Sequence, residues 1–409
     1  MIKFIHTADI HFGMENYGKI DPATGIHTRL LDFEKALNFC IDFAVDNQVD
    51  FFLFSGDAYK TAHPSPTQQH LLLQCFLRLY KAQIPIIIIV GNHDNPLSFG
   101  KANSLEIFGQ LPVSGFHVIS KPTTLLIETK SGPVQIVGIP WPTRNNITTA
   151  STNLVSSAIE ITDLISKSLS RIIKQMAEQL DQNIPSVLAG HLTVTSGIFS
   201  GSEKKAIYGT DPVFLPSELA IEPFDYVALG HLHRYQNLNA KGYPAVVYSG
   251  SIERIDFGER KEEKGFCFVK IHEKNNTEHE FIKTPTRPFI QIELELSDDI
   301  DQTEQILNEL KKHEVKDSVI KIIYTLNQGQ KDKVDIPAIQ QACADAMYIA
   351  GIVPIRKNII RDRRTPLKVD MDLIKLLDSY LSNRQELKSK KDSLLAKAVD
   401  LENQCECDN

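Results

Sequence analysis

Five short segments of the chain bring together aspartate, histidine and asparagine, side chains that can bind divalent metal ions. They are Asp9-Ile10-His11, Gly56-Asp57, Gly91-Asn92-His93-Asp94, Gly190-His191 and Gly230-His231-Leu232-His233. Carboxylate, imidazole and amide ligands suit Mn, Fe or Zn, and the segments hold no thiolate that would favour zinc alone. Each segment by itself is common in surface turns, but the five together predict a metal site.

The spacing of these residues predicts two metal ions rather than one. Asp9 and His11 are two residues apart, so both can face one side of a strand end, and His231 and His233 repeat that arrangement. Two divalent ions about 3.5–4 Å apart need one shared ligand, commonly a carboxylate. We expect Asp57 to be that ligand, because it stands alone between the paired motifs.

Other catalytic patterns are missing from the sequence. It contains no Gly-x-Ser-x-Gly motif, and no Gly-x-G-x-x-Gly motif follows a predicted strand. It also lacks a Gly-x-x-x-x-Gly-Lys-Ser/Thr loop, so we do not expect ATP binding by that route.

Each of the five segments begins where an apolar run stops. The alternation of short apolar strands with amphipathic helices predicts a layered α/β fold whose sheet is buried on both faces. In such folds functional residues gather at the carboxyl ends of the strands. We predict strands at 2–7, 49–55, 84–90, 134–139, 186–189, 226–229, 245–248 and 265–271, and helices at 33–45, 67–81 and within 151–183.

Composition sets limits on class and partners. The chain has 409 residues, 42% of them hydrophobic and 23% charged, which fits a globular protein of two or three domains. The net charge of −7 argues against a wholly basic surface for nucleic acid, although a local patch remains open. The longest aliphatic run, 84–90, is too short for a membrane span, and the N-terminus lacks an export signal. We expect a cytoplasmic protein with reduced thiols, because the six cysteines form no Cys-x-x-Cys pair.

A second unit is predicted after the prolines at 285 and 288. Its pattern is a small α/β arrangement of strands at 289–296, 319–325 and 353–360 with helices at 301–313 and 336–346. Residues 356–368 carry six basic side chains against one acidic, a net charge of +5. That stretch is either a solvated linker or a patch that contacts phosphate or a partner.

The C-terminal stretch 371–404 is predicted to be helical. One heptad position is apolar throughout, at Leu373, Tyr380, Leu387, Leu394 and Leu401. The second heptad position that a two-stranded coiled coil needs to be apolar is so in only half of its repeats. This favours a helix that docks on a partner over one that folds back on its own core. Cys405 and Cys407 could bind a metal, although a frayed polar tail is the preferred interpretation.

The order of the five motifs resembles that of the calcineurin-like metallophosphoesterases. Within that superfamily the chain is similar to the nuclease subunits of bacterial complexes that process DNA ends. The narrower likeness rests on Phe4 to Gly13, on Pro64-Ser65-Pro66, on Tyr248 to Arg254 and on Phe257-Gly258-Glu259. At Lys60 the sequence departs from these nucleases, which often have an acidic residue or histidine there.

The resemblance implies a role for each candidate residue. One metal ion is assigned to Asp9, His11, Asp57 and His233, and the second to Asp57, Asn92, His191 and His231. A water activated between the ions would attack phosphorus. His93 would act as general acid or transition-state stabiliser, and Asp94 would orient His93 or serve as a simple turn cap.

The resemblance also implies fold, activity and partners. It implies a layered metallophosphoesterase sandwich at 1–284, a small α/β capping or DNA-binding domain at 285–365, and a helical tail at 366–409 that docks on a coiled-coil ATPase. The implied activity is a Mn-dependent 3′-to-5′ exonuclease on duplex ends and an endonuclease on single strands or hairpins. The nuclease would be a homodimer, through helices at 66–81 and 102–108. The alternatives are a phosphoesterase for small phosphodiesters or nucleotides, and a non-enzymatic scaffold.

Overall fold

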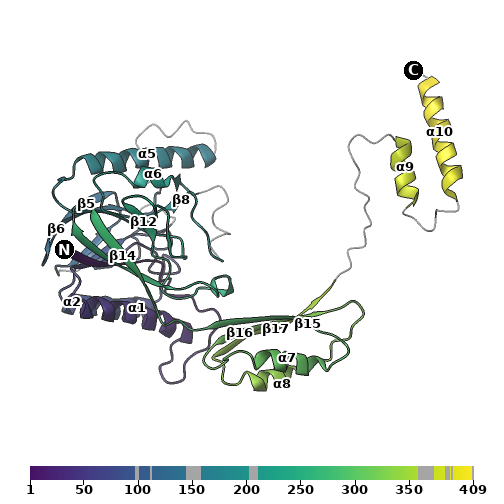
Figure 1. The fold of residues 1–409 in the computed structure, drawn as a ribbon, viewed down its shortest axis with the longest axis horizontal. Coiled ribbons are helices and arrows are strands. Elements are labelled where there is room, and N and C mark those ends of the chain that lie inside the picture. Colours follow the sequence, from purple (N-terminus) through teal and green to yellow (C-terminus); the bar gives the residue numbers. More distant parts are fainter. Residues whose placement is uncertain are drawn as a thin grey trace.

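Two six-stranded sheets packed face to face form the larger part of the molecule. The computed structural model describes residues 1–96, 101–110, 113–143, 158–201, 211–357, 373–382, 387 and 390–407. The first sheet has the order β14-β13-β1-β2-β3-β4 and the second the order β11-β12-β10-β7-β6-β5. We call these sheets with their helices the sandwich (Figure 1).

The two sheets share one plan. In the first, β1 (Ile2–Thr7), β2 (Phe51–Phe54), β3 (Ile86–Ile89) and β4 (Phe116–Ile119) are parallel, and β13 (Gly265–Glu273) and β14 (Asn276–Lys283) are added antiparallel. In the second, β6 (Gly132–Ile139), β7 (Ser186–His191), β10 (Tyr226–Gly230) and β12 (Ala245–Tyr248) are parallel, flanked by antiparallel β5 (Thr123–Thr129) and β11 (Gln236–Asn237). Each sheet therefore has four parallel strands whose carboxyl ends can present site residues.

Alternating side chains explain the layers. In β2, Phe51 and Leu53 pack between the two sheets, whereas Phe52 and Phe54 face α1 (Thr28–Asp46) and α2 (Pro66–Lys81). On the far side, α5 (Ala158–Glu178) covers the second sheet (Figure 1). The result is a layered α/β sandwich, which confirms the predicted fold class.

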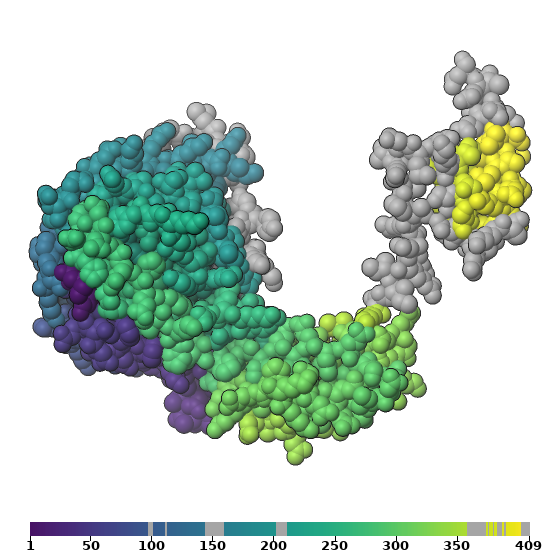
Figure 2. Space-filling model, in the orientation of Figure 1, coloured from purple at the N-terminus to yellow at the C-terminus, as the bar shows by residue number. Residues whose placement is uncertain are grey.

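The small α/β unit consists of three parallel strands and two helices. The strands β15 (Phe289–Glu295), β16 (Val319–Leu326) and β17 (Tyr348–Arg356) are covered on one face by α7 (Gln302–Leu310) and α8 (Ile336–Ala342). Figure 2 shows the light-green atoms of this unit abutting the sandwich. Beyond it, α9 (Leu373–Ser382) and α10 (Lys391–Cys407) lie together, joined by an ion pair of 2.7 Å between Lys391 and Asp378.

The remaining elements are short. They are α3 (Glu106–Gly109), β8 (Thr193–Val194), β9 (Val213–Phe214), α6 (Pro216–Leu219) and the 3-10 helix η3 (Phe257–Glu259). None of the helices in the described stretches combines the length and apolar character that a membrane span requires.

Several predicted bounds need correction. The third strand of the small unit spans Tyr348–Arg356 instead of 353–360, of which 358–360 lie outside the described residues. The helix expected at 102–108 is only Glu106–Gly109, because 101–105 form turns and irregular backbone. The backbone at Cys405 and Cys407 continues α10 and is not a frayed tail. Part of the expected helix at 151–183 and most of the basic stretch 356–368 lie outside the described residues.

A buried histidine between the sheets should make stability depend on pH. His6 is fully buried, and its ring nitrogens each lie 3.2 Å from an oxygen of the second sheet, the Tyr226 hydroxyl and the Leu229 carbonyl. Burial lowers the pKa of His6 to about 3 from its usual 6.5. Between these values the unfolded chain binds a proton that the folded chain does not, so stability falls as the pH drops through this window.

We expect proton uptake by His6 in the unfolded chain to lower the free energy of unfolding by about 2 kcal/mol when the pH falls from 6.5 to 5. Urea unfolding at both pH values would measure this loss in the wild type and in His6→Gln. His6→Gln should be less stable than the wild type at both pH values. Its free energy of unfolding should fall by about 2 kcal/mol less than that of the wild type on acidification. An equal loss in both proteins would contradict the assignment.

Candidate metal centre

The structure gathers all of the predicted site residues at one edge of the sandwich. They follow the carboxyl ends of parallel strands in both sheets, as the sequence predicts. From the first sheet come Asp9 and His11 after β1, Asp57 after β2, and Asn92, His93 and Asp94 after β3; from the second come His191 at the end of β7, and His231 and His233 after β10.

One cluster forms around His11 and His233. Their Nε2 atoms are 3.0 Å apart, and His11 Nε2 is 3.7 Å from Asp57 Oδ2. Asp9, His11 and His233 offer ligand atoms that all lie within 4.8 Å of one another. Two imidazole nitrogens and two carboxylates thus converge on one point, as ligands of a single ion do.

A second cluster forms around Asn92. Its Oδ1 lies 2.9 Å from His191 Nε2 and 3.2 Å from His231 Nδ1. His191 Nε2 is in turn 3.4 Å from Asp57 Oδ2, the oxygen that also approaches His11. One carboxylate oxygen therefore stands between the two clusters, where a bridging ligand is needed.

Four of these residues have a backbone conformation that side chains rarely adopt. The φ angles of Asp9, His11, Asp57 and His231 are 55°, 53°, 59° and 104°. Such residues cost of order 1–3 kcal/mol each and persist where surrounding structure holds them. Here hydrogen bonds between the loops hold them: Asp9 N donates to Gly56 O at 2.9 Å, and His11 N to Asp57 O at 3.1 Å.

Two glycines permit this close approach. A Cβ added to Gly91 would lie 2.2 Å from Asp57 Oδ1, and one added to Gly230 would lie 2.1 Å from Ser55 O. Any side chain at either position would push the loops apart and separate the ligand clusters.

The electrostatics of the site suit cations. Asp9 is 0% and Asp57 1% exposed, and the ion pairs of Asp57 are with the histidines at 11, 93 and 191. Burial raises the pKa of Asp9. Burial acts the same way on Asp57, but the charges of His191 and His93 hold the pKa of Asp57 well below its usual value. Buried carboxylates without a lysine or arginine partner among the described residues fit the binding of metal ions.

Hydrogen bonds fix the tautomers of two ligand candidates. His191 Nδ1 donates to Ser55 O at 2.8 Å, and His233 Nδ1 donates to Glu259 Oε1 at 2.9 Å. Both rings therefore have Nε2 directed at the clusters, the nitrogen through which each would bind a metal ion.

Glu259 is a site residue that the sequence reasoning did not assign. It is fully buried, and its second oxygen lies 2.9 Å from Lys264 Nζ. Burial would raise the pKa of Glu259, but Lys264 and His233 lower it to about 2, so the group is a carboxylate at neutral pH. The only signal was its place in the Phe257-Gly258-Glu259 segment.

Trp141 lines the second cluster and was likewise not predicted. It follows β6, and its ring centroid lies 4.8 Å from that of His231 and 6.0 Å from that of His191. Asp211 also approaches this side of the site, with Oδ2 3.8 Å from His231 Nε2.

His93 lies at the open side of the site. Its side chain is 40% exposed, and Nε2 lies 4.0 Å from Asp57 Oδ2. His93 Nδ1 lies 2.8 Å from the Lys60 carbonyl oxygen and therefore donates this hydrogen bond. The other ring nitrogen, Nε2, faces the clusters. The ring also meets that of His11 edge to face at 4.9 Å.

The position of Asp94 differs from the expectation that it orients His93. Its carboxylate is fully buried and accepts backbone N–H groups from Asp57, Ala58, Tyr59 and Gly91 at 2.8–3.2 Å. The Lys60 carbonyl, not Asp94, accepts the hydrogen bond of the His93 ring. Asp94 therefore fastens the Asp57 loop to the following loop, which is closer to the turn-cap interpretation.

Replacing Asp94 with alanine should destabilise the protein and disturb the site together. Up to four buried N–H donors would lose their acceptor, so we expect a loss of at least about 3 kcal/mol in unfolding free energy. Denaturant unfolding measures it, with Asp46→Ala as a control, since Asp46 is exposed at the end of α1. A change below about 0.5 kcal/mol, typical of surface sites, would show that the loops do not depend on Asp94.

Comparison with protein families gives the class of this protein. Residues 2–235, more than half of the chain, match the family described as calcineurin-like phosphoesterases. The chain belongs to that family. Together with the buried aspartate and histidine clusters, this makes it a metal-dependent phosphodiesterase.

Two curated proteins narrow the likeness further. Both are named as the SbcD component of the nuclease SbcCD. The one from Staphylococcus saprophyticus is 31% identical over 296 residues, covering 72% of this chain and 71% of that protein. The one from Staphylococcus epidermidis is 29% identical over 302 residues, covering 72% of each. The predicted resemblance to nucleases of this kind is confirmed.

The crystal structure of a dimetal phosphatase from Danio rerio aligns with 69% of this chain and 99% of that chain, at 10% sequence identity and a TM-score of 0.38.

Proposed function

We propose that this protein is a two-metal DNA nuclease that uses Mn²⁺ as its ion. The central observation is the position of Asp57 Oδ2, which lies 3.7 Å from His11 Nε2 and 3.4 Å from His191 Nε2. The names of its relatives support DNA as the substrate. The expected activities are 3′-to-5′ exonuclease on duplex ends and endonuclease on single strands or hairpins, in DNA repair and recombination.

The proposed ligand sets follow the two clusters. Asp9, His11, Asp57 and His233 would hold one ion, and Asp57, Asn92, His191 and His231 the other. Bound divalent ions would activate a water and neutralise charge on the phosphate oxygens. His93, as an imidazolium that keeps its Nδ1 proton on the Lys60 carbonyl, would donate its Nε2 proton to the leaving 3′ oxygen at the open side of the site. The Lys60 carbonyl holds the His93 ring in place for that transfer.

The proposed division of labour follows the chain. Residues 1–284 would form the nuclease domain, and 285–365 a capping domain that contacts DNA. Residues 366–409 would dock on the coiled coil of an SbcC-type ATPase, the partner that the relatives' complex name suggests. Leu394 and Leu401 support docking, because these leucines, seven residues apart, are 39% and 52% exposed on α10.

A homodimer is also proposed, through the surface of α2 and α3. The rings of Phe76 and Phe108 join these helices at 5.5 Å. Ile107 on the same short helix is 60% exposed, and Tyr80 at the end of α2 is 38% exposed. Exposed apolar side chains on adjacent helices are typical of a protein–protein contact.

The decisive experiment is a nuclease assay on defined ends. The purified chain is incubated with Mn²⁺ and linear duplexes whose 3′ ends are free or blocked, beside a small phosphodiester substrate. Release of mononucleotides from free ends alone supports the proposal. Cleavage of the small ester without any cleavage of DNA, with and without the ATPase partner, would replace the nuclease by a general phosphoesterase.

A further inference from the structure

The turn η3 touches the candidate metal centre through one of its residues. Glu259 Oε1 accepts from His233 Nδ1 at 2.9 Å, and Oε2 accepts from the backbone N–H of Ile255 at 2.9 Å. Lys264 Nζ bonds Glu259 and also the carbonyl oxygen of His233, both at 2.9 Å. These three side chains are 0–6% exposed, so the His233 ring cannot turn unless Glu259 moves.

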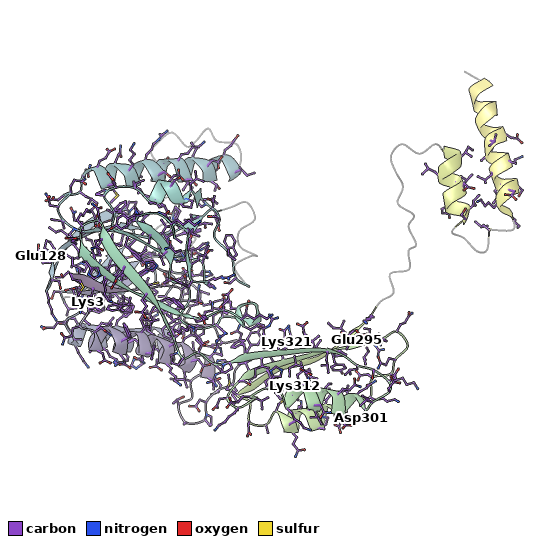
Figure 3. The ribbon with its side chains drawn as sticks, in the orientation of Figure 1. Lys3, Glu128, Glu295, Asp301, Lys312 and Lys321 are labelled. Carbon is purple, nitrogen blue, oxygen red and sulfur yellow. The ribbon has the colours of Figure 1, made fainter. Side chains whose placement is uncertain are left out.

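The same turn touches the small α/β unit through its first residue. The Phe257 ring is buried between two rings, with centroid distances of 5.0 Å to Phe289 and 5.2 Å to Tyr17. It forms one apolar cluster with Phe289 and Val319, which begin β15 and β16. Lys321 Nζ lies 5.7 Å from the Phe257 centroid, and in Figure 3 Lys321 is nearer to the sandwich than Glu295 is.

Ion pairs next to this cluster hold the small unit against the sandwich. Arg287, just before β15, binds both carboxylate oxygens of Asp32 on α1, with Nε to Oδ2 at 2.7 Å. Arg29 bonds the same carboxylate at 2.7 Å, and its guanidinium lies 5.1 Å from the Phe289 centroid. The strand that supports Phe257 is thus held against the sandwich by a bidentate pair with low solvent exposure.

We propose that η3 couples the packing of the small α/β unit against the sandwich to the candidate metal centre, with Glu259 as the positioning residue for His233. Phe289 packs against Phe257, the three-residue turn joins Phe257 to Glu259, and the hydrogen bond of Glu259 fixes the direction of the His233 ring. This inference rests on the proposed role of His233 as a metal ligand. It predicts that a change in the small unit, remote from every ligand, alters the binding of one of the two ions.

Calorimetric titration of the full-length protein with Mn²⁺ tests the inference directly. Three variants are compared with the wild type: Glu259→Gln, Phe289→Ala and, as a matched control, Ile306→Ala. Ile306 is buried in the core of the same unit, on α7, and lies outside the cluster around Phe257. It therefore reports loss of packing in the small unit without loss of support for η3.

The wild type should bind two ions, and Glu259→Gln and Phe289→Ala should each weaken one binding step only. We expect a loss of about 10- to 100-fold for Glu259→Gln, the usual effect of removing a partner of a ligating histidine. For Phe289→Ala we expect a loss of about 2- to 30-fold, the range of coupling through intervening residues. Ile306→Ala should bind both ions as the wild type does.

Three results would overturn the inference, and one of them concerns the proposed function itself. If Phe289→Ala binds Mn²⁺ as well as Ile306→Ala does, the small unit is not coupled to the centre. If folded Glu259→Gln retains wild-type affinity, Glu259 does not position His233. If the wild-type protein binds no Mn²⁺ at all, the two-metal proposal fails together with this one.

Discussion

Replacing Asp57 with asparagine is expected to abolish binding of both metal ions and, with it, phosphodiester cleavage. The Asp57 oxygen between the clusters lies within 4 Å of His11 and of His191, one candidate ligand from each cluster. Asparagine keeps the size of the side chain and tolerates the left-handed backbone at this position, so the fold should survive. Since the ions supply several kcal/mol of transition-state stabilisation, activity should fall by at least about 10³-fold.

Metal content after exhaustive dialysis, measured beside activity, checks this prediction. Asp50→Asn is the matched control, because Asp50 is also a buried aspartate that accepts backbone N–H groups, from Lys3 and Ser131, away from the clusters. The control should retain two ions. An Asp57→Asn protein that still held two ions would show that another ligand bridges the site.

Replacing His93 with alanine should separate metal binding from turnover. His93 is the most exposed of the candidate site histidines, and its Nε2 lies 4.0 Å from Asp57 Oδ2. We therefore expect two bound ions with turnover on DNA lowered by roughly 10²–10⁴-fold, the usual contribution of acid–base catalysis. Parallel loss of metal would instead make His93 a ligand, an arrangement that its proximity to His11 and Asp57 also permits.

The leaving group distinguishes a general acid from other roles. A p-nitrophenyl ester leaves with little help from a proton, whereas the 3′ oxygen of DNA requires it. The His93→Ala defect should therefore be much smaller on the p-nitrophenyl substrate. His63→Ala, a change of a histidine outside the clusters, serves as the control and should leave both reactions unaffected. Equal defects on both substrates would argue for charge stabilisation instead of proton donation.

The sequence predicted which residues meet at one edge of the sandwich, because each motif is recognised from its own short stretch of chain. Each motif follows a buried run such as 86–89 or 226–230, and parallel strands bring their carboxyl ends to one edge. The expectation of a shared carboxylate came from the isolated position of Asp57, whose Oδ2 lies near both His11 and His191. No distance between sheets was needed for these inferences.

The groups that support the ligands could not be predicted in the same way. Glu259 lies 26 positions after His233 and meets it only because the chain returns through β12 and η3. The carboxylate of Asp94 accepts N–H groups from residues 35–37 positions away, and backbone donors leave no mark in a sequence. For this reason the sequence suggested that Asp94 orients His93, whereas in the structure its carboxylate ties two loops together.

The fold was predicted best where strands are buried on both faces. The uninterrupted runs of β2 and β3 stand out, whereas β5 and β14 were missed. These two are edge strands that alternate exposed and partly buried side chains, and in β5 only Ile127 is buried. Edge strands of mixed polarity resemble loops when hydrophobicity is the main signal.

Each ligand cluster takes side chains from both sheets of the sandwich. His233 from the second sheet meets Asp9 and His11 from the first, and His191 and His231 meet Asn92 in the same way. Ions bound there would favour the assembled sandwich by mass action, by about 2.7 kcal/mol at a hundredfold excess over the dissociation constant. Scarcity of the ion in a cell would then lower the abundance of the protein, because chains that open more often are removed by proteolysis.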